Sequence, residues 1–168
     1  MFEQLCKTPS DINEHLITLR DLTKECESVT EMGVRYCVST FAFIEGNPKK
    51  LTCIDINHPS YYVPQEGGKN FDKAVELAKE KGIDFKFIQG DTLTIDIDET
   101  DLLFIDTLHT YPQLNAELKR HASKAKKYIV LHDTSSCPEL WDAVEELRGW
   151  EVKERFTNCS GLTILIPC

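Results

Sequence analysis

The sequence lacks the features that mark several classes of protein. Its 168 residues contain no apolar run near the roughly 20 residues that a membrane-spanning helix requires. Lysine and arginine number 19 against 28 acidic residues, and the resulting net charge of −9 gives no general attraction for phosphate backbones. We therefore expect neither a membrane protein nor a nucleic-acid-binding protein.

Cysteine spacing and the first residues exclude two further classes. None of the seven cysteines forms a C-x-x-C pair, so neither a zinc knuckle nor a dithiol redox motif is indicated. The opening "MFEQLCKTPSD" lacks the basic-then-apolar order of a signal peptide. We therefore expect a cytoplasmic protein with reduced thiols that serve as small hydrophobic residues.

The chain also lacks linkers, repeats and low-complexity segments, which predicts a single domain over residues 1–168, with an N-terminal helical segment (1–27) and a core (28–168). Apolar periodicity predicts helices over 10–27, with Ser10 as N-cap, and over about 37–45, and helices beginning at Asn70, Pro112 and Pro138. Between them, short apolar runs predict strands at about 28–32, 51–55, 83–88, 101–106 and 128–132.

Alternating strands and helices are typical of a parallel sheet covered on both faces. The end of the chain differs, because "WEVKERF" and "GLTILIP" are separated only by the short segment "TNCS" and so predict an antiparallel hairpin. The expected fold is α/β: a Rossmann-like, doubly wound sheet of five parallel strands plus that C-terminal hairpin, seven strands in all, with helices on both faces.

An acidic residue stands at or just after the end of every predicted parallel strand. These residues are Glu31, Asp55, Asp91, Asp106 and Asp133. The carboxyl ends of parallel strands meet at one edge of the sheet, where ligands bind in open α/β folds. Since like charges crowded together raise their own energy, we expect this edge to receive a ligand that is positively charged or rich in hydroxyl and amino groups.

The first two strand ends narrow the choice of ligand. Asp55 lies 24 residues after Glu31, near the offset of about 20 at which an acid receives ribose hydroxyls in dinucleotide sites. Of a three-glycine loop only Gly33 is present, with Arg35 and Cys37 at the other two places, so a pyrophosphate would lack the close backbone approach it needs. This favours S-adenosylmethionine over NAD.

Five segments in order carry a resemblance to a known family. "VTEMGVRYCVST", "LTCIDIN", "IQGD", "DLLFIDTLHTY" and "YIVLHDT" resemble the motifs of class I S-adenosylmethionine-dependent methyltransferases, and most closely the small branch of metal-dependent and sugar O-methyltransferases. The resemblance covers roughly residues 28–166. Cys37 and Thr107 depart from it, because each stands where the family usually has glycine.

The resemblance implies a role for each matching position. The Glu31–Gly33 turn would lie under the amino-acid portion of the cofactor, with Ser39 nearby, and Glu31 would meet its positive charge. Asp55 would accept both ribose hydroxyls. Asp91, with Thr92 beside it, would lie near the adenine amine. Asp106 would face the sulfonium and the methionine amine.

Polar residues beyond the fourth and fifth strands are candidates for catalysis of methyl transfer to a hydroxyl of a small molecule or sugar. His109 or His132 could take the proton from the acceptor, with Asp133 beside them. Asp106 and Asp133 could share Mg²⁺, which prefers oxygen ligands, or could serve only as hydrogen-bond acceptors. A zinc site with both histidines is a further alternative, although no local ligand spacing supports it.

The predicted connections after strands four and five carry no insertion that could cover a substrate. Only residues 1–27 and the loop 57–68 offer spare chain, so a large partner would present the acceptor, a second subunit would close the site, or activity would be lost. A non-catalytic cofactor-binding or scaffold protein on the same fold is the main alternative. A nicotinamide-dependent oxidoreductase is disfavoured by the missing glycines.

Overall fold

The computed structural model describes residues 1–62 and 67–168, and its seven strands form one sheet. Their order across the sheet is β3-β2-β1-β4-β5-β7-β6. The first five are parallel, whereas β7 pairs antiparallel with both β5 and β6. The strands are β1 (Ser28–Met32), β2 (Lys50–Asp55), β3 (Asp84–Gln89), β4 (Thr100–Ile105), β5 (Ala125–His132), β6 (Trp150–Phe156) and β7 (Leu162–Pro167).

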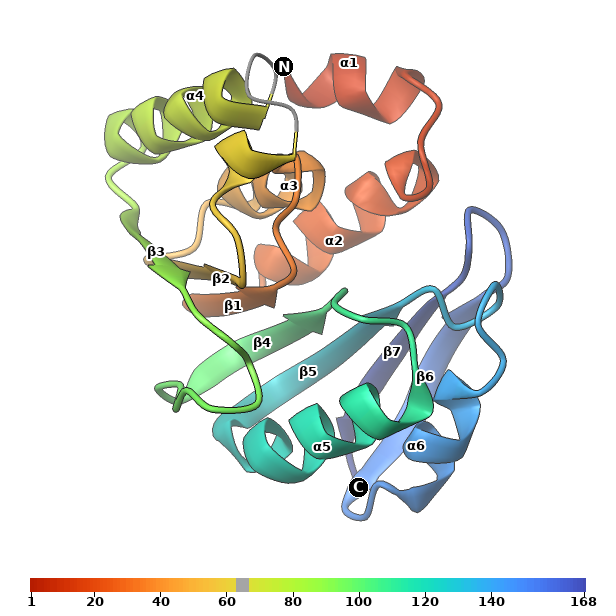
Figure 1. Cartoon of the computed structure of the whole chain (residues 1–168). Helices are drawn as coiled ribbons and strands as arrows, with labels where there is room; N and C mark the ends of the chain where they lie inside the picture. Colours follow the sequence, from red (N-terminus) through yellow and green to blue (C-terminus); the bar gives the residue numbers. More distant parts are fainter. Residues whose placement is uncertain (63–66) are drawn as a thin grey trace.

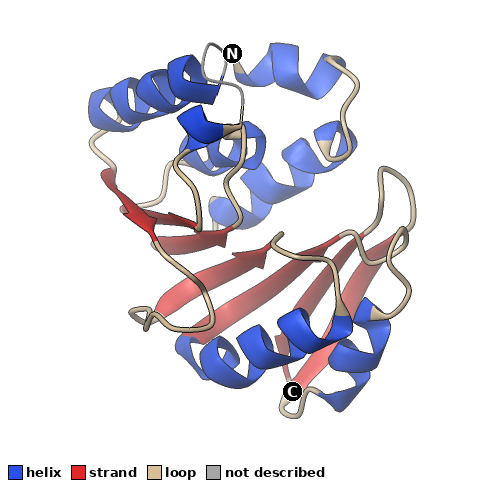
Figure 2. Cartoon of the chain, in the orientation of Figure 1, coloured by secondary structure: helices blue, strands red, loops and turns tan. Residues whose placement is uncertain are grey.

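Helices cover both faces of the sheet, as Figures 1 and 2 show. The helices are α1 (Phe2–Lys7), α2 (Leu16–Thr23), α3 (Val38–Gly46), α4 (Gly67–Glu80), α5 (Tyr111–His121) and α6 (Leu140–Glu146). Helices α1 to α4 lie on one side and α5 and α6 on the other, so each face has its own apolar core. Short 3₁₀ turns span Asn13–His15, Pro59–Tyr61 and Ala122–Lys124. The predicted sheet, with its C-terminal antiparallel hairpin, is confirmed.

Three predicted helix starts are wrong. Residues 10–27 do not form one helix, because the N–H of Ser10 bonds to the side chain of Asn13 in a turn and α2 begins only at Leu16. Asn70 lies inside α4, where its side chain donates to the carbonyl of Tyr36. Pro138 belongs to the turn before α6.

None of the described helices is long and apolar enough to cross a membrane. The order of the sheet reverses between β1 and β4, where chain connections leave in opposite directions. Such a switch point opens a crevice beyond the carboxyl ends of the strands, and this is where a ligand is expected. Of the loop 57–68, residues 63–66 lie outside the described residues.

Candidate functional site

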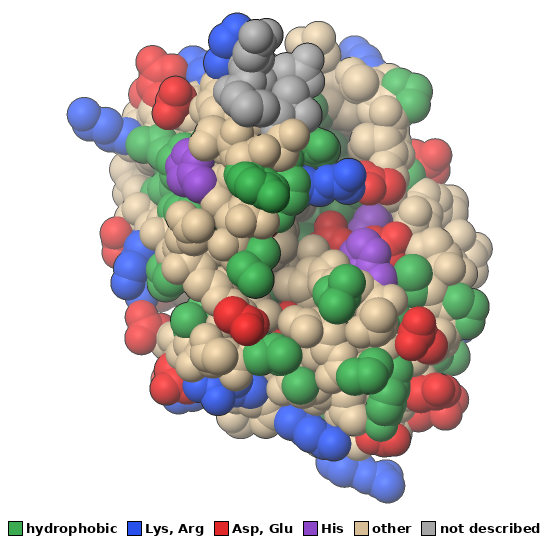
Figure 3. Space-filling model, in the orientation of Figure 1, with side chains coloured by type: hydrophobic (Ala, Val, Ile, Leu, Met, Phe, Trp, Pro, Cys, Tyr) green, Lys and Arg blue, Asp and Glu red, His purple; other side chains and the backbone are tan. Residues whose placement is uncertain are grey.

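A cleft of about 540 Å³ opens at this switch point. Figure 3 looks onto the hollowed face, where histidine and acidic side chains lie beside the hollow. Segments after β1, β2, β3 and β4 all contribute to its lining. The lining residues are Asp11, Ile12, Gly33, Val34, Arg35, Tyr36, Val38, Ser39, Ile54, Asp55, Ile56, Tyr62, Gly90, Asp91, Thr92, Leu93, Asp106, Thr107, Leu108, His109 and Gln113.

The turn from β1 into α3 forms the floor of the cleft. Gly33 has φ of +87°, and a Cβ placed on it would lie 1.9 Å from the carbonyl oxygen of Asp106, so only glycine fits. Arg35 and Cys37 also have positive φ, 46° and 64°. The turn therefore keeps left-handed backbone at all three places where the three-glycine loop would have glycine, at a cost of about 1 kcal/mol for each side chain there.

The Glu31 side chain lies beneath this floor and not in the cleft. It is fully buried, and its carboxylate accepts hydrogen bonds from the hydroxyls of Ser39 and Thr40 (2.7 Å for Thr40) and from the thiol of Cys53 at 3.1 Å. The expectation that Glu31 meets a cationic ligand directly is therefore wrong: its acceptor capacity is used within the protein, where it ties α3 to β1 and β2.

Burial also raises the pKa of Glu31 to about 7, against a usual value of 4.5, although its three hydrogen bonds oppose the shift. The folded protein holds this proton more tightly than the unfolded chain does. Protonation of Glu31 therefore stabilises the folded state fully below pH 4.5, and this stabilisation is lost as the pH rises through 7. We expect this group alone to lower the free energy of unfolding by on the order of 3 kcal/mol over that interval. Glu31→Gln, which cannot ionise, should remove that decline. Urea unfolding of both proteins between pH 4.5 and 8 checks this, and parallel profiles would contradict it.

Asp55, at the end of β2, is held by four hydrogen bonds. Its Oδ2 accepts the backbone N–H groups of Val34 at 2.8 Å and Arg35 at 2.9 Å, and these bonds fix the left-handed turn. Its Oδ1 accepts the N–H of Asn57 and the hydroxyl of Tyr62, each at 3.0 Å. Asp55 lines the cleft, as predicted, and a diol would reach Oδ1 in exchange for the Tyr62 hydroxyl.

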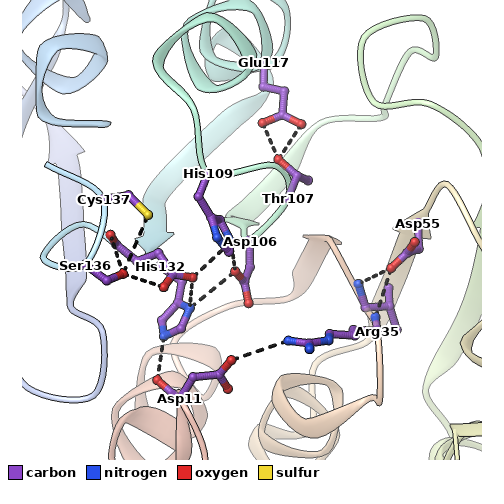
Figure 4. A network of polar contacts seen from close by, with 12 residues as sticks. Asp11, Arg35, Asp55, Asp106, Thr107, His109, Glu117, His132, Ser136 and Cys137 are labelled. Carbon is purple, nitrogen blue, oxygen red and sulfur yellow. Dashed lines mark hydrogen bonds and ion pairs between the residues drawn. The ribbon is translucent and has the colours of Figure 1, made fainter. Parts of the chain in front are cut away.

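Two carboxylates and two imidazoles meet beyond β4 and β5 (Figure 4). His109 Nε2 lies 3.1 Å from Asp106 Oδ1 and 3.0 Å from Asp133 Oδ2. His132 Nδ1 lies 3.3 Å and 2.9 Å from the same two oxygens, while its Nε2 lies 3.0 Å from the carbonyl oxygen of Asp11. The sequence prediction that these four side chains come together is confirmed by the structure.

The charges in this cluster are set by His132. Burial disfavours its charged form, but hydrogen bonds to Asp106 and Asp133 outweigh burial and raise the pKa of His132 to about 11. Despite burial, hydrogen bonds from His109 and His132 hold the pKa of Asp106 below its usual value, and the hydrogen bond from His132 does the same for Asp133. His132 is thus an imidazolium with both nitrogens donating, and the expectation that it acts as a base is wrong.

His109 differs from His132 in being accessible from the cleft. Its side chain is 39% exposed, and the hydrogen bond to Asp106 raises its pKa. Among the described residues its hydrogen-bond and ion-pair contacts all involve Nε2, which leaves Nδ1 for a ligand. Asp106, His109 and Asp133 also offer ligand atoms that all lie within 4.8 Å of one another, close enough to coordinate one metal ion.

Two charged groups at this end of the cleft were missed by the sequence analysis. Arg35 and Asp11 pair across the cleft, with Arg35 Nη1 and Asp11 Oδ2 3.6 Å apart. Both side chains are more than half exposed, so both can contact a ligand. Arg35 is the one lysine or arginine among the lining residues given above. In the sequence, Arg35 was noted only as standing where a three-glycine loop would have its second glycine, and no pattern pairs it with Asp11.

The opposite end of the cleft is lined by the uncharged polar side chains of three residues and by the carboxylate of Asp91. Thr92 and Gln113 lie there with Thr107, and all three contact the buried carboxylate of Glu117 on α5. Asp91 is exposed and accepts the N–H of Leu93 at 2.9 Å. Thr92 and Asp91 line the cleft as predicted, whereas Glu117 and Gln113 were missed because they lie on a helix whose pattern signals only its apolar side.

Neither a protein-family model nor a curated protein sequence matches the chain. Solved structures do resemble it. TomG, an O-methyltransferase from Streptomyces achromogenes solved in complex with S-adenosylmethionine, is 12% identical and superposes with a TM-score of 0.67, over 95% of this chain and 81% of that chain. An O-methyltransferase from Bacillus cereus, solved with S-adenosylhomocysteine, is 10% identical, with a TM-score of 0.66 over 92% of this chain and 81% of that one.

Methyltransferases with larger substrates share the same architecture. The 16S rRNA methylase RmtB is 19% identical, with a TM-score of 0.58 over 94% of this chain and 63% of that chain. Similarity at these identities establishes the fold. The chain has the Rossmann-like fold of class I S-adenosylmethionine-dependent methyltransferases, as the resemblance of its motifs implied.

Proposed function

We propose that the protein is an S-adenosylmethionine-dependent methyltransferase that acts on a hydroxyl group of a small molecule or sugar. The observation that carries this proposal is the cleft at the switch point. It brings Gly33, Asp55, Thr92 and Asp106 to one cavity of about 540 Å³. Each of the four comes from the end of a different parallel strand, and the fold is one that methyltransferases share.

The two ends of the cleft suit the two ends of the cofactor. Arg35 would contact the carboxylate of the methionine portion, and Asp11 and Asp106 would contact its ammonium and sulfonium charges. Asp55 would accept the ribose hydroxyls at Oδ1. The exposed side chains of Ile56 and Leu108, 62% and 64% accessible, supply apolar surface at the cleft for the flat adenine ring.

His109 would act as the general base that removes the proton from the acceptor hydroxyl. If its Nε2–H is directed at the carboxylates of Asp106 and Asp133, its Nδ1 lone pair is free to take the hydroxyl proton. The acceptor oxygen then forms a bond to the methyl carbon as the bond from that carbon to sulfur breaks. Bound S-adenosylmethionine would supply the methyl group and leave as S-adenosylhomocysteine. The carboxylates hold the imidazole in position, so orientation contributes to the rate.

A divalent metal would assign these side chains differently. Asp106 and Asp133 would supply oxygen ligands and His109 a nitrogen ligand, a mixed set that suits Mn²⁺ or Zn²⁺ as well as Mg²⁺. The residue after Asp133 does not join them, because the Thr134 hydroxyl accepts from Thr163 at 2.9 Å. A metal there would lower the pKa of a coordinated acceptor hydroxyl. Mn²⁺ binding followed by electron paramagnetic resonance tests the site without an activity assay.

Ligand binding is the first test of the proposal. S-adenosylmethionine and S-adenosylhomocysteine should raise the melting temperature, while NAD⁺ should not. A ligand at 100 times its dissociation constant stabilises a protein by about 2.7 kcal/mol, so titration to that range gives a clear shift. Asp55→Ala is the matched variant, because it removes the ribose acceptor and should abolish the shift. No shift with either sulfur compound would overturn the proposal.

Acceptor class is tested by transfer of a tritiated methyl group from the cofactor to catechols, sugars and a structured RNA. We expect label in a hydroxylated small molecule and none in RNA, since the net charge is −9. The connections after β4 and β5 are short, and neither of them covers His109, whose side chain is 39% exposed. Label in RNA would refute the acceptor class, and cofactor binding without label in any acceptor would favour the non-catalytic alternative.

A further inference from the structure

A buried carboxylate orients the uncharged polar side chains at the Thr92 end of the cleft. Glu117 has no exposed surface and lies on α5 behind the cleft wall. Its Oε1 accepts hydrogen bonds from the Thr92 hydroxyl and from Gln113 Nε2, the latter at 2.9 Å. Figure 4 shows the Thr107 hydroxyl directed at both carboxylate oxygens, and each of these contacts is 2.8 Å long. No cation takes part in these contacts.

The carboxylate fixes the direction of every hydrogen in this network. The carboxylate oxygens of Glu117 accept each of these hydrogen bonds, so the hydroxyl hydrogens of Thr92 and Thr107 point at Glu117 and away from the cleft. Gln113 turns its NH₂ group toward Glu117 and, at 3.3 Å, toward the Thr92 hydroxyl, which leaves its carbonyl oxygen as its free polar atom. His121 lies 2.7 Å from the Thr92 carbonyl oxygen and holds that residue in place.

The side chains at this end therefore present acceptors to a ligand: lone pairs of Thr92 and Thr107 and the carbonyl oxygen of Gln113, all three among the lining residues. A ligand group placed against them has to donate. The opposite end of the cleft holds the cation Arg35 beside Asp11, so a tail that carries both charges belongs there and the rest of the ligand lies at the Glu117 end.

We propose that Glu117 is a positioning residue that makes this site selective for a 6-aminopurine over a 6-oxopurine. The inference rests on the proposed function. It specifies that the adenine ring of the cofactor binds at the Glu117 end of the cleft and is recognised by hydrogen-bond acceptors. The exocyclic NH₂ of adenine donates to the acceptors that Glu117 orients. A 6-oxopurine places a carbonyl oxygen in the same position, so acceptor would face acceptor and both would stay unpaired.

Calorimetric titration with S-adenosylhomocysteine and S-inosylhomocysteine tests the selectivity. The two compounds differ at position 6 and in the N1 proton that follows from it. We expect the wild-type protein to bind the 6-amino compound about 10 to 100 times more tightly, the range expected for one buried hydrogen bond lost with its partners left unpaired.

Glu117→Gln should compress this ratio to within about threefold. An amide both donates and accepts, so the hydroxyls of Thr92 and Thr107 are free to turn toward the cleft. Glu31→Gln is the matched control, since Glu31 is an equally buried carboxylate that also accepts from two threonine or serine hydroxyls but does not line the cleft. It should leave the ratio as in the wild type, whatever it does to each affinity.

Thr107→Val, which keeps the shape and removes one acceptor, is the second variant if Glu117→Gln fails to fold, and it should lower the ratio at least threefold. Equal binding of both compounds by the wild type would overturn the inference and leave the proposed function standing. The inference would also be overturned, and the proposed function left standing, if the ratio of the two affinities were unchanged in Glu117→Gln, or in Thr107→Val where Glu117→Gln does not fold. Absence of binding by either compound would overturn both.

Discussion

Gly33→Ala is expected to destabilise the protein by about 4 kcal/mol or more, the range reached only by severe single substitutions. The added Cβ would lie 1.9 Å from the Asp106 carbonyl oxygen and 2.6 Å from its carbon. Neither backbone can move away, because the Gly33 N–H donates to the Ile54 carbonyl and the Asp106 N–H donates to the Met32 carbonyl, at 2.9 Å and 2.8 Å. The variant must separate β1 from β4 at the switch point.

Gly82→Ala is the control that distinguishes the steric clash at Gly33 from the cost of placing a side chain on left-handed backbone. Gly82 has φ of +72°, close to the +87° of Gly33, but a Cβ on it meets nothing within 4 Å. It should cost only about 1 kcal/mol. Urea unfolding of both variants gives the comparison, and Gly33→Ala should also lose the thermal shift with S-adenosylhomocysteine. Equal losses of stability would show that the close approach of the two strand ends is not what requires glycine.

The order of strands and the edge that carries the site could be predicted because they depend on local pattern. Apolar runs such as 51–55 and 128–132 match β2 and β5 within three residues at each end. The helix starts were less predictable, because Ser10 and Asn70 are good capping residues whose hydrogen bonds here go to a turn and to the distant Tyr36 carbonyl. Sequence alone does not tell which acceptor a capping side chain finds.

Positions in the site were predicted better than roles. Asp55 is the last residue of β2, and Asp106 and Asp133 directly follow β4 and β5, so their place at the sheet edge is a consequence of topology. Their partners come from afar: His132 Nε2 lies 3.0 Å from the carbonyl oxygen of Asp11, 121 positions earlier in the chain. That contact helps to make His132 a donor at both nitrogens instead of a base, and periodicity carries no trace of it.

The same reasoning explains why Glu31 was misread. An acid at a strand end is costly in a core only when nothing donates to it. The residues that satisfy Glu31 are short side chains of α3 and β2, Ser39, Thr40 and Cys53, which in the sequence look like ordinary members of apolar runs. Burial of a carboxylate with three donors could not be distinguished from exposure to a cationic ligand until the fold was known.

His132→Ala is expected to lower the free energy of unfolding by about 3 to 5 kcal/mol, because it removes the buried cation between two carboxylates. The His132 side chain is 1% exposed, and the side chains of Asp106 and Asp133 are 24% and 11% exposed. His121→Ala is the matched control. His121 is equally buried, but its ring contacts one carbonyl oxygen and no carboxylate, and burial lowers its pKa, which disfavours the charged form. Its removal leaves a similar cavity and no unpaired charge.

A second substitution tests the charge explanation directly. With His132 absent, the carboxylates of Asp106 and Asp133 repel each other with only His109 nearby, so Asp133→Asn should restore part of the stability lost in His132→Ala. In the wild-type background the same substitution should destabilise, because it removes an ion pair of 2.9 Å. The effect of Asp133→Asn thus changes sign between the two backgrounds, a coupling that urea unfolding of the four proteins measures. Additive effects would show that His132 stabilises the fold through packing, and that the acids at the ends of β4 and β5 do not depend on its charge.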